Sequence, residues 1–286
     1  MNITNTEQIQ FFEDNGYLRY GPAIESNEVE ELRAGLDRVI HIEATGGDDT
    51  SPEFKFGHRR DDDAEGSVRP ITQFMNMWKR EPVFERILHE PRISGVAAAL
   101  LGTSRVRLWH DHVISKPPGD NGNFEFHQDF YFWPLDEPCI LSCWLALDDA
   151  TPDNGCMHVL PESHKDPRFG LEAYAAEIEA IKKSKDPSEV PKTPRQLMHH
   201  ELASIGKPVE LKAGECMFHH SLNFHATPAN VTSQPRRAHV MIFMAEGVKV
   251  KRSNASDHPL MPLIEVDDGT ELVGKDFPLI HPRMSA

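Results

Sequence analysis

The sequence predicts a mainly β fold, a sandwich or barrel, with helices added at the N-terminal end. Two observations support this prediction. Apolar residues recur at helical spacing in the first hundred residues, whereas from Arg105 onward short apolar runs are separated by Pro, Gly, Asp and Asn clusters. Many short strands bounded by turn residues are typical of sandwiches and barrels. With 286 residues and 39% hydrophobic content, the chain is long enough for one sizeable core.

The N-terminal region is expected to be helical. Gly16 is a typical stop for a first helix, Asn27 and Glu30 are spaced as a capping box at the start of a second, and Pro91 separates the last two. Residues 46–70 are polar and indicate a loop. Helical spacing of apolar residues predicts four helices, over residues 6–15, 27–40, 83–88 and 92–101.

The remainder is expected to be mostly strands. A helix over residues 171–178 interrupts them, and the polar, proline-broken segment 182–196 is expected to be a loop or lid. We expect a single domain, 1–286, with a mostly helical region over residues 1–104, a barrel core 105–250, an insertion near 165–200 and a C-terminal extension 251–286. The predicted strands are 106–115, 124–132, 140–147, 157–160, 209–211, 216–218 and 236–244.

Composition excludes several classes of partner and location. The formal net charge of −15 argues against a general affinity for nucleic acid or for an anionic membrane surface. No apolar run is long enough to span a membrane, and the polar N-terminus does not read as a secretory signal. Cys139 and Cys143 lie in a strand-like apolar run and are expected to be buried free thiols. A reducing cytoplasm fits this cysteine usage best.

The segment 123–133, NFEFHQDFYFW, combines aromatic and metal-binding side chains. In a strand, side chains alternate between faces, so His127 and Asp129 can present an imidazole and a carboxylate to one point. These are two of the three ligands of a 2-His-1-carboxylate triad, which leaves positions open on iron(II). An H-x-D pair also occurs by chance in many proteins. The polar face of this predicted strand carries Glu125, His127, Asp129 and Tyr131.

A second segment, 214–240, offers a third ligand and a cation. The candidate ligands are His219, His220 and His225, and spacing alone does not choose among them. Arg236 and Arg237 follow in a predicted strand, so one is expected to enter the barrel and the other to meet solvent. An oxygenase that uses 2-oxoglutarate needs a cation for the distal carboxylate, and the planar fork of arginine matches a carboxylate.

Three blocks of the sequence together resemble the phytanoyl-CoA dioxygenase family of Fe(II)- and 2-oxoglutarate-dependent oxygenases. They occur in family order over roughly the middle half of the chain, and the N-terminal FFEDNGYL also fits. The blocks are ISKPPGDNGNFEFHQDFYFWP, CWLALDDATPDNGCMHVLPESHK and FHHSLNFHATPANVTSQPRRA.

The resemblance implies a choice among the histidines. In the family pattern the liganding histidine begins an H-x-S/T-x-x-N turn, and an arginine follows eleven positions later. This selects His225 as the third ligand beside His127 and Asp129, and Arg236 as the carboxylate clamp. His219 matches a histidine of the family that is not a ligand. His220 matches no family role.

The resemblance also implies a 2-oxoglutarate site. Thr227 is expected to add a hydroxyl to the carboxylate that Arg236 binds, and Trp144 is expected to line the site. His112 occupies a position that flanks the co-substrate, although an apolar residue is frequent there in the family. Without the resemblance, Trp144 reads as a core residue and His112 as a buried, hydrogen-bonded histidine. Tyr131 and Trp133 are candidate substrate contacts, with core packing as their alternative.

The family fold is a double-stranded β-helix, a jelly-roll or cupin-like barrel with helices outside. The implied reaction uses Fe(II), 2-oxoglutarate and O2 to hydroxylate or otherwise oxidise an unactivated C–H bond of a small molecule, releasing succinate and CO2. Relatives that halogenate replace the carboxylate of the triad with a small residue, so the retained Asp129 indicates hydroxylation or a related oxidation.

Two alternative functions use the same residues. A zinc hydrolase or isomerase could use the same three ligands on the same barrel, but it has no need of the arginine clamp. A non-catalytic binding protein would carry the histidines incidentally. The sequence carries no signal for the primary substrate or for the oligomeric state.

Overall fold

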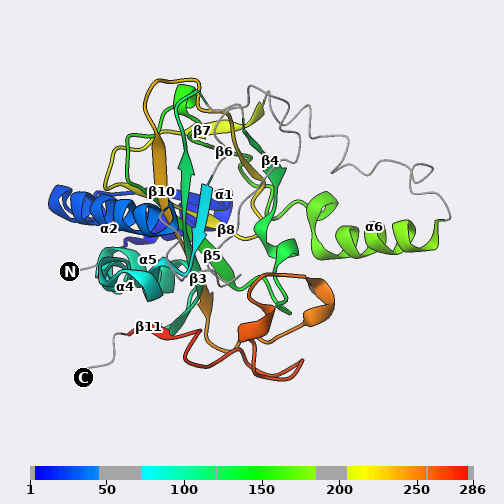
Figure 1. The fold of residues 1–286 in the computed structure, drawn as a ribbon. Coiled ribbons are helices and arrows are strands. Elements are labelled where there is room, and N and C mark those ends of the chain that lie inside the picture. The colour runs from blue at the N-terminus through cyan, green and yellow to red at the C-terminus, as the bar shows by residue number, and fades with distance from the viewer. Residues whose placement is uncertain (1–3, 45–71, 120–121, 185–204, 256, 283–286) are drawn as a thin grey trace.

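The computed structural model describes residues 4–44, 72–119, 122–184, 205–255 and 257–282. Its centre is a pair of antiparallel β-sheets, one of seven strands and one of four (Figure 1). Side chains of both sheets, among them Trp144, Val240, Met157 and Val209, pack in one buried cluster between them. The fold is therefore mainly β with added helices, as the sequence predicted, and it has the jelly-roll arrangement.

The larger sheet has the strand order β1-β8-β5-β10-β3-β11, and β2 also pairs with β3. The smaller sheet has the order β4-β9-β6-β7. The strands of the larger sheet are β1 (Tyr17–Tyr20), β2 (Thr72–Met75), β3 (Val106–Lys116), β5 (Ile140–Ala146), β8 (Cys216–His220), β10 (Arg236–Ala245) and β11 (Leu279–His281). Those of the smaller sheet are β4 (Phe124–His127), β6 (Met157–Val159), β7 (Lys207–Val209) and β9 (His225–Thr227).

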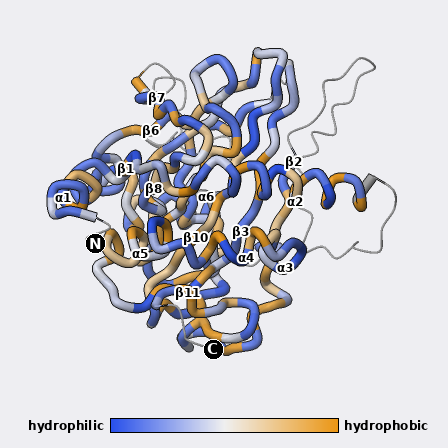
Figure 2. Tube along the Cα trace, turned by 90° about the vertical axis from the view of Figure 1, so that its left-hand side faces the viewer, coloured by the Kyte–Doolittle hydropathy of each residue, from blue (hydrophilic) through white to orange (hydrophobic). Residues whose placement is uncertain are grey.

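Helices cover the outer face of the larger sheet. Leu32, Phe84 and Val96 from three of them pack against Cys143 and Phe218 on that face. Hydrophobic and hydrophilic stretches alternate along most elements, as expected where each has one buried face (Figure 2). The helices are α1 (Thr6–Asn15), α2 (Ser26–Ala44), α3 (Met77–Arg80), α4 (Pro82–Leu88), α5 (Pro91–Leu100) and α6 (Leu171–Lys183). Short 3₁₀ helices are η2 (Asp129–Phe132), η3 (Pro152–Asn154), η4 (Pro167–Phe169), η6 (Arg252–Asn254) and η7 (Met261–Leu263).

Strand register decides which side chains point into the barrel. Val240 of β10 lies opposite Trp144 of β5 on one side and His112 of β3 on the other. In the neighbouring row, Ser142 lies opposite both Ile242 and His219. Since partners in a row share a face, the inner face combines apolar packing with a limited set of polar groups.

The four predicted N-terminal helices are present, but the predicted start of the second is wrong. α2 begins at Ser26, and the capping box proposed for Asn27 and Glu30 does not form there. Instead, the backbone N–H of Glu25 donates to the Glu28 carboxylate at 2.9 Å. The Glu28 carboxylate thus accepts a backbone N–H at the start of the helix, two residues earlier in the chain than the predicted capping box.

The predicted strand 124–132 is also wrong in its second half. β4 ends at His127, and Asp129–Phe132 forms the 3₁₀ helix η2. The Phe130 N–H donates to the Ser221 carbonyl at 3.1 Å, which turns the chain across the end of the barrel. Strict alternation of faces therefore stops after His127. One consequence is that Phe132 is 59% exposed instead of packing with the other phenylalanines.

Four short strands were not predicted, and one cysteine was misplaced. The missed strands, β1, β2, β9 and β11, have three or four residues each, too few for a period-2 pattern to be recognised. Cys139 is exposed because it precedes β5 instead of lying within it, while Cys143 is buried as expected. The predicted loop 46–70 and most of the predicted lid 182–196 lie outside the described residues.

The segment after β10 covers one end of the barrel (orange to red in Figure 1). Val250 forms a β-bridge with Leu135, and the Lys251 N–H donates to the Pro134 carbonyl at 2.8 Å. Leu260 and Phe277 enter the core between the sheets. The segment is thus packed onto the chain that directly follows η2.

No helix among the described residues is long and apolar enough to cross a membrane.

We expect Gly155→Ala to destabilise the fold by about 3 kcal/mol. Gly155 has a φ of +82°, and an added Cβ would collide with the Pro228 carbonyl oxygen, which accepts a hydrogen bond from the buried Lys116 ammonium. Chemical denaturation measures the change in unfolding free energy. Gly102→Ala is the matched control, because Gly102 has a φ of +63° and open space around it. It should cost only about 1 kcal/mol. Equal effects of the two substitutions would refute the collision.

Candidate metal centre

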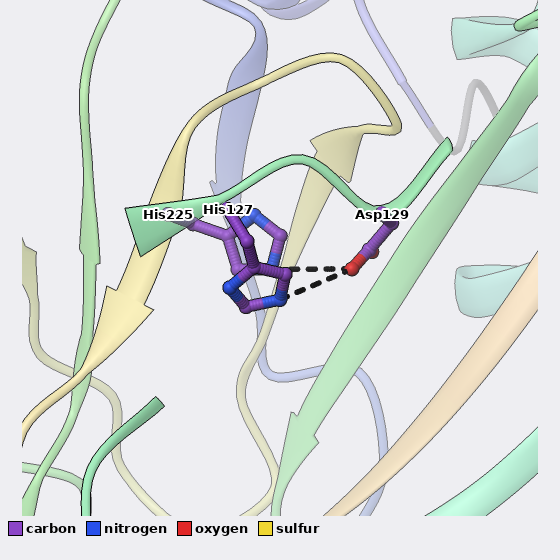
Figure 3. A group of neighbouring side chains, drawn as sticks. All are labelled: His127, Asp129 and His225. Atoms are coloured by element: carbon purple, nitrogen blue, oxygen red, sulfur yellow. Dashed lines mark ion pairs between the residues drawn. The ribbon is translucent and has the colours of Figure 1, made fainter. Parts of the chain in front are cut away.

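Three side chains from two neighbouring strands and the turn between the sheets converge on one point. His127 ends β4, Asp129 begins η2, and His225 begins β9. His127 and His225 are register partners across β4 and β9. One potential ligand atom from each of the three residues lies within 4.8 Å of the others (Figure 3). The structure therefore brings together the three ligands selected from the sequence.

The donor atoms face each other with short separations. Oδ1 of Asp129 lies 3.4 Å from Nε2 of His127 and 3.4 Å from Nε2 of His225. The Nδ1–H of His127 donates to the Glu125 carbonyl at 2.7 Å, and that of His225 donates to the Asn223 carbonyl at 3.0 Å. A carbonyl can only accept, so both rings carry their proton on Nδ1 and direct the Nε2 lone pair to the centre.

The second oxygen of Asp129 is held by two groups of the larger sheet. The Ser142 hydroxyl donates to Oδ2 at 3.0 Å, and Nε2 of the buried His219 lies 3.2 Å from it. These contacts leave Oδ1 as the oxygen that faces the two histidines. From the sequence, His219 was identified only as a non-ligand and Ser142 was missed, although a lone hydroxyl among the apolar residues of β5 was a signal.

The surroundings keep Asp129 ionised. Burial alone would disfavour its charge, but the neighbouring imidazoles of His225, His127 and His219 outweigh that effect and hold the pKa of Asp129 well below its usual value. Two imidazoles and one carboxylate converge on a point from one side. A metal ion held there would keep coordination positions open on its other side. This donor set and geometry fit a non-heme iron(II) site.

The centre opens on one side. The side chains of His127, Asp129 and His225 are 29%, 19% and 5% exposed, so access is from the His127 side. The exposed ring of Phe132 lies against His127, with ring centroids 6.1 Å apart. Phe132 therefore lies on the exposed side of the centre.

A second group of side chains lies deeper in the barrel. Arg236 is fully buried, and its guanidinium carbon lies 5.1 Å above the Trp144 ring. Its register partner Lys116 donates to the carbonyl of Thr227 at 2.9 Å, which ties β3 to β9 of the smaller sheet. The Thr227 hydroxyl and the Trp144 indole N–H are buried, and neither has a hydrogen-bond partner among the described residues. This combination fits a carboxylate bound between Arg236 and Thr227.

Arg237 points to the opposite face, as alternation predicted, but it does not simply meet solvent. Its guanidinium forms two hydrogen bonds of 2.9 Å with the carboxylate of Asp148, and its side chain is only 18% exposed. The pair joins β10 to the end of β5 outside the barrel. Arg236 is therefore buried inside the barrel, and Arg237 pairs with Asp148 on the other face of the same strand.

The other histidines selected from the sequence divide into two groups. His112 lies on the inner face, where burial lowers its pKa to about 3 and keeps the ring neutral. Its Nδ1 is 3.5 Å from Nδ1 of His110. His220 is not at the centre, because its Nδ1 accepts the Leu222 N–H and its ring packs near Phe12.

Tyr131 and Trp133 are turned away from the ligands by η2. The Tyr131 hydroxyl donates to the Phe169 carbonyl at 2.9 Å, and its ring stacks on Tyr174 of α6 with centroids 3.9 Å apart. Trp133 is buried in the cluster between the sheets. The core-packing alternative describes both residues, while Phe132, which was not selected from the sequence, is the aromatic residue beside the centre.

Comparison with known proteins gives a consistent result. The phytanoyl-CoA dioxygenase family model matches residues 12–238 of the chain. A probable phytanoyl-CoA dioxygenase of Caenorhabditis elegans is 25% identical over 246 residues, covering 83% of this chain and 74% of the relative. A methylphosphonate hydroxylase of Gimesia maris is 27% identical over 253 residues, covering 86% of this chain and 84% of the relative.

A solved structure shows the same fold. The non-heme alpha-ketoglutarate-dependent carbocyclase SnoK from nogalamycin biosynthesis superimposes with a TM-score of 0.71. The two chains are 23% identical, and the match covers 97% of this chain and 96% of that one.

Removal of any of the three converging ligands should abolish iron(II) binding. His127→Ala, Asp129→Ala and His225→Ala each delete one donor of the set, and anaerobic titration calorimetry with iron(II) measures the loss. His220→Ala is the control and should bind iron(II) as the wild type does, since its ring lies away from the centre. Retained binding in His225→Ala together with loss in His220→Ala would show that the third ligand was misassigned.

Ser142→Ala should weaken iron(II) binding without removing a ligand. The substitution frees Oδ2 of Asp129 from one of its two partners, and loss of such a supporting contact typically costs about 10–100-fold in metal affinity. Ser94→Ala is the control, because the Ser94 hydroxyl is also buried but bonds only the Glu90 carbonyl of its own helix. Equal metal affinity in both variants would contradict a supporting role for Ser142.

Proposed function

The chain belongs to the phytanoyl-CoA dioxygenase family, and we propose that it hydroxylates, or otherwise oxidises, an unactivated C–H bond of a small molecule. It is an Fe(II)- and 2-oxoglutarate-dependent dioxygenase that uses O2 and releases succinate and CO2. We assign His127, Asp129 and His225 as the iron ligands. Arg236, Thr227 and Trp144 are assigned to 2-oxoglutarate.

The observation that favours this function over the alternatives is the buried arginine. Arg236 lies inside the barrel over Trp144, on the same side of the sheet as the ligand set, and its register partner Lys116 bonds Thr227. A zinc hydrolase or isomerase on this barrel needs three ligands and a water, and it has no use for a buried guanidinium. A co-substrate with a distal carboxylate requires one.

Each residue has a distinct task. When bound, iron(II) and 2-oxoglutarate supply the oxidising chemistry that attacks the C–H bond. The two histidines present Nε2 lone pairs in fixed orientations because backbone carbonyls hold their Nδ1 protons. Asp129 contributes one charged oxygen, and its other oxygen is fixed by Ser142 and His219. Arg236 and Thr227 bind and orient the far carboxylate of the co-substrate within the apolar wall of Trp144.

Asp129 also favours an oxidation over a halogenation of the substrate. The carboxylate occupies the position that halogenating relatives leave small, and its contacts with Ser142 and His219 hold it in place. Transfer of oxygen, desaturation or ring formation is therefore favoured over halogenation. His112, neutral beside the same site, is assigned to flank the co-substrate.

A cytoplasmic location is part of the proposal. All four cysteines are free thiols, and three of them, Cys143, Cys156 and Cys216, are buried. Buried unpaired thiols are typical of proteins in a reducing compartment. Fractionation of cells that produce the protein tests this assignment, and recovery in an organelle or at a membrane would refute it.

Arg236→Ala should raise the KM for 2-oxoglutarate about a hundredfold, in line with removal of one partner of a buried charge pair. The assay follows iron-dependent conversion of 2-oxoglutarate to succinate under air. Arg236→Lys should give a smaller rise, because an ammonium keeps the charge but loses the two-pronged geometry.

Arg237→Ala is the matched control for this experiment. It removes the adjacent arginine, which pairs with Asp148 outside the barrel, and should leave the KM for 2-oxoglutarate unchanged. An equal rise in both alanine variants would contradict the assignment of Arg236. Absence of any succinate formation by the wild type would refute the proposed function itself.

A further inference from the structure

We propose that His258 and His110 form the polar wall of the primary-substrate pocket and recognise an uncharged hydroxyl or carbonyl group of the substrate by hydrogen bonding. This assignment rests on the proposed oxygenase function and names the substrate class for the same site. The two histidines come from distant regions of the chain, β3 and the segment after η6, yet their ring centroids lie 5.9 Å apart.

Packing of the C-terminal segment brings His258 to the site. Asn254 donates to the Leu135 carbonyl at 2.7 Å, and Leu260 is buried between the sheets, so His258 follows one anchored residue and precedes another. Leu135 itself lies only a few residues beyond the ligand Asp129. The ring of His258 lies 5.2 Å from that of Trp109 and is only partly covered, so a small molecule can reach it.

The hydrogen-bonding state of His258 follows from its contacts. Its Nδ1 lies 3.2 Å from the backbone N–H of Leu260, which can only donate. Nδ1 is therefore the acceptor, and the neutral ring carries its proton on Nε2. His258 thus offers one N–H donor at the end of its ring, pointing away from its own backbone turn.

His110 extends this polar surface toward the metal ligands. Its Nδ1 is 3.5 Å from Nδ1 of His112, and in neutral rings one of these nitrogens must donate and the other accept. His110 lies in the same register row as Ile242 and Ser142, and the Ser142 hydroxyl bonds Asp129, so this row ends at the ligand set. His112, His110 and His258 therefore form a row of rings that leads from the proposed co-substrate site to the C-terminal segment.

Neutral imidazoles select the class of group that they bind. Burial lowers the pKa of His258 to about 4 and that of His110 well below its usual value, so neither ring supplies a positive charge near neutral pH. A carboxylate or phosphate buried there would gain no countercharge from either ring and would be disfavoured. A hydroxyl or carbonyl matches donors and acceptors of neutral rings without that cost.

The position of His258 in the chain suits it to the recognition of one particular substrate. The family model matches residues 12–238, and His258 lies beyond that match. A residue outside the shared segment that reaches the shared site is suited to distinguish one substrate from another.

The test uses the iron-loaded enzyme with 2-oxoglutarate and pairs of small molecules that share a skeleton, one an alcohol and the other the matching carboxylate or phosphate ester. Succinate formation above the substrate-free level reports productive binding. We expect alcohols, and not their ionised partners, to stimulate the wild type. In His258→Asn the KM for a stimulating alcohol should rise about tenfold, while substrate-free turnover and the KM for 2-oxoglutarate stay unchanged.

His258→Asn separates recognition from a structural role. The asparagine side-chain oxygen can still accept the Leu260 N–H in an Asx turn, but the ring Nε2–H is lost. His281→Asn, on β11 of the same segment, is the control and should leave the KM unchanged. Stimulation by the ionised partners, stimulation by no alcohol, or a wild-type KM in His258→Asn would overturn the assignment. Absence of substrate-free turnover in the wild type would instead refute the oxygenase function on which it rests.

Discussion

The ionised carboxylate of Asp129 is the group on which the arrangement of the site depends. A largely buried anion is costly unless it is paired and hydrogen-bonded. Here its partners come from four strands of both sheets: His127 of β4, Ser142 of β5, His219 of β8 and His225 of β9. One oxygen is fixed by the larger sheet and the other faces the smaller one. The two sheets are therefore joined at the point where a metal ion would bind.

Strand register decides which polar side chains of β10 and β3 face the inside of the barrel. Along β10, Arg236 points inward and Arg237 outward, so one strand both places a buried guanidinium inside the barrel and pairs with Asp148 outside it. Along β3, alternate residues His110, His112 and Ile114 face the interior, from the end beside His258 toward the Arg236 end. The period-2 geometry of the two long strands thus places His110, His112 and Arg236 in order along one wall.

The sequence predicted those features that follow from a short local pattern with a single geometry. Apolar spacing identified the N-terminal helices, and H-x-D identified His127 and Asp129. The choice of His225 over His220 needed the family pattern, because spacing alone is equivalent for both. Face assignment failed at Tyr131 because η2, which is stabilised by the distant Ser221 carbonyl, replaces the strand. Ser142 and His258 were not identified, because their roles depend on contacts between segments far apart in the chain.

The most direct test of an iron centre built on Asp129 is anaerobic visible spectroscopy of the metal-free protein after addition of iron(II) and then 2-oxoglutarate. We predict a weak charge-transfer band of iron-chelated 2-oxoglutarate in the wild type, and no such band in Asp129→Ala. No band in the wild type, together with tight zinc binding, would contradict the iron centre and would favour a zinc-dependent hydrolase or a binding protein on the same barrel.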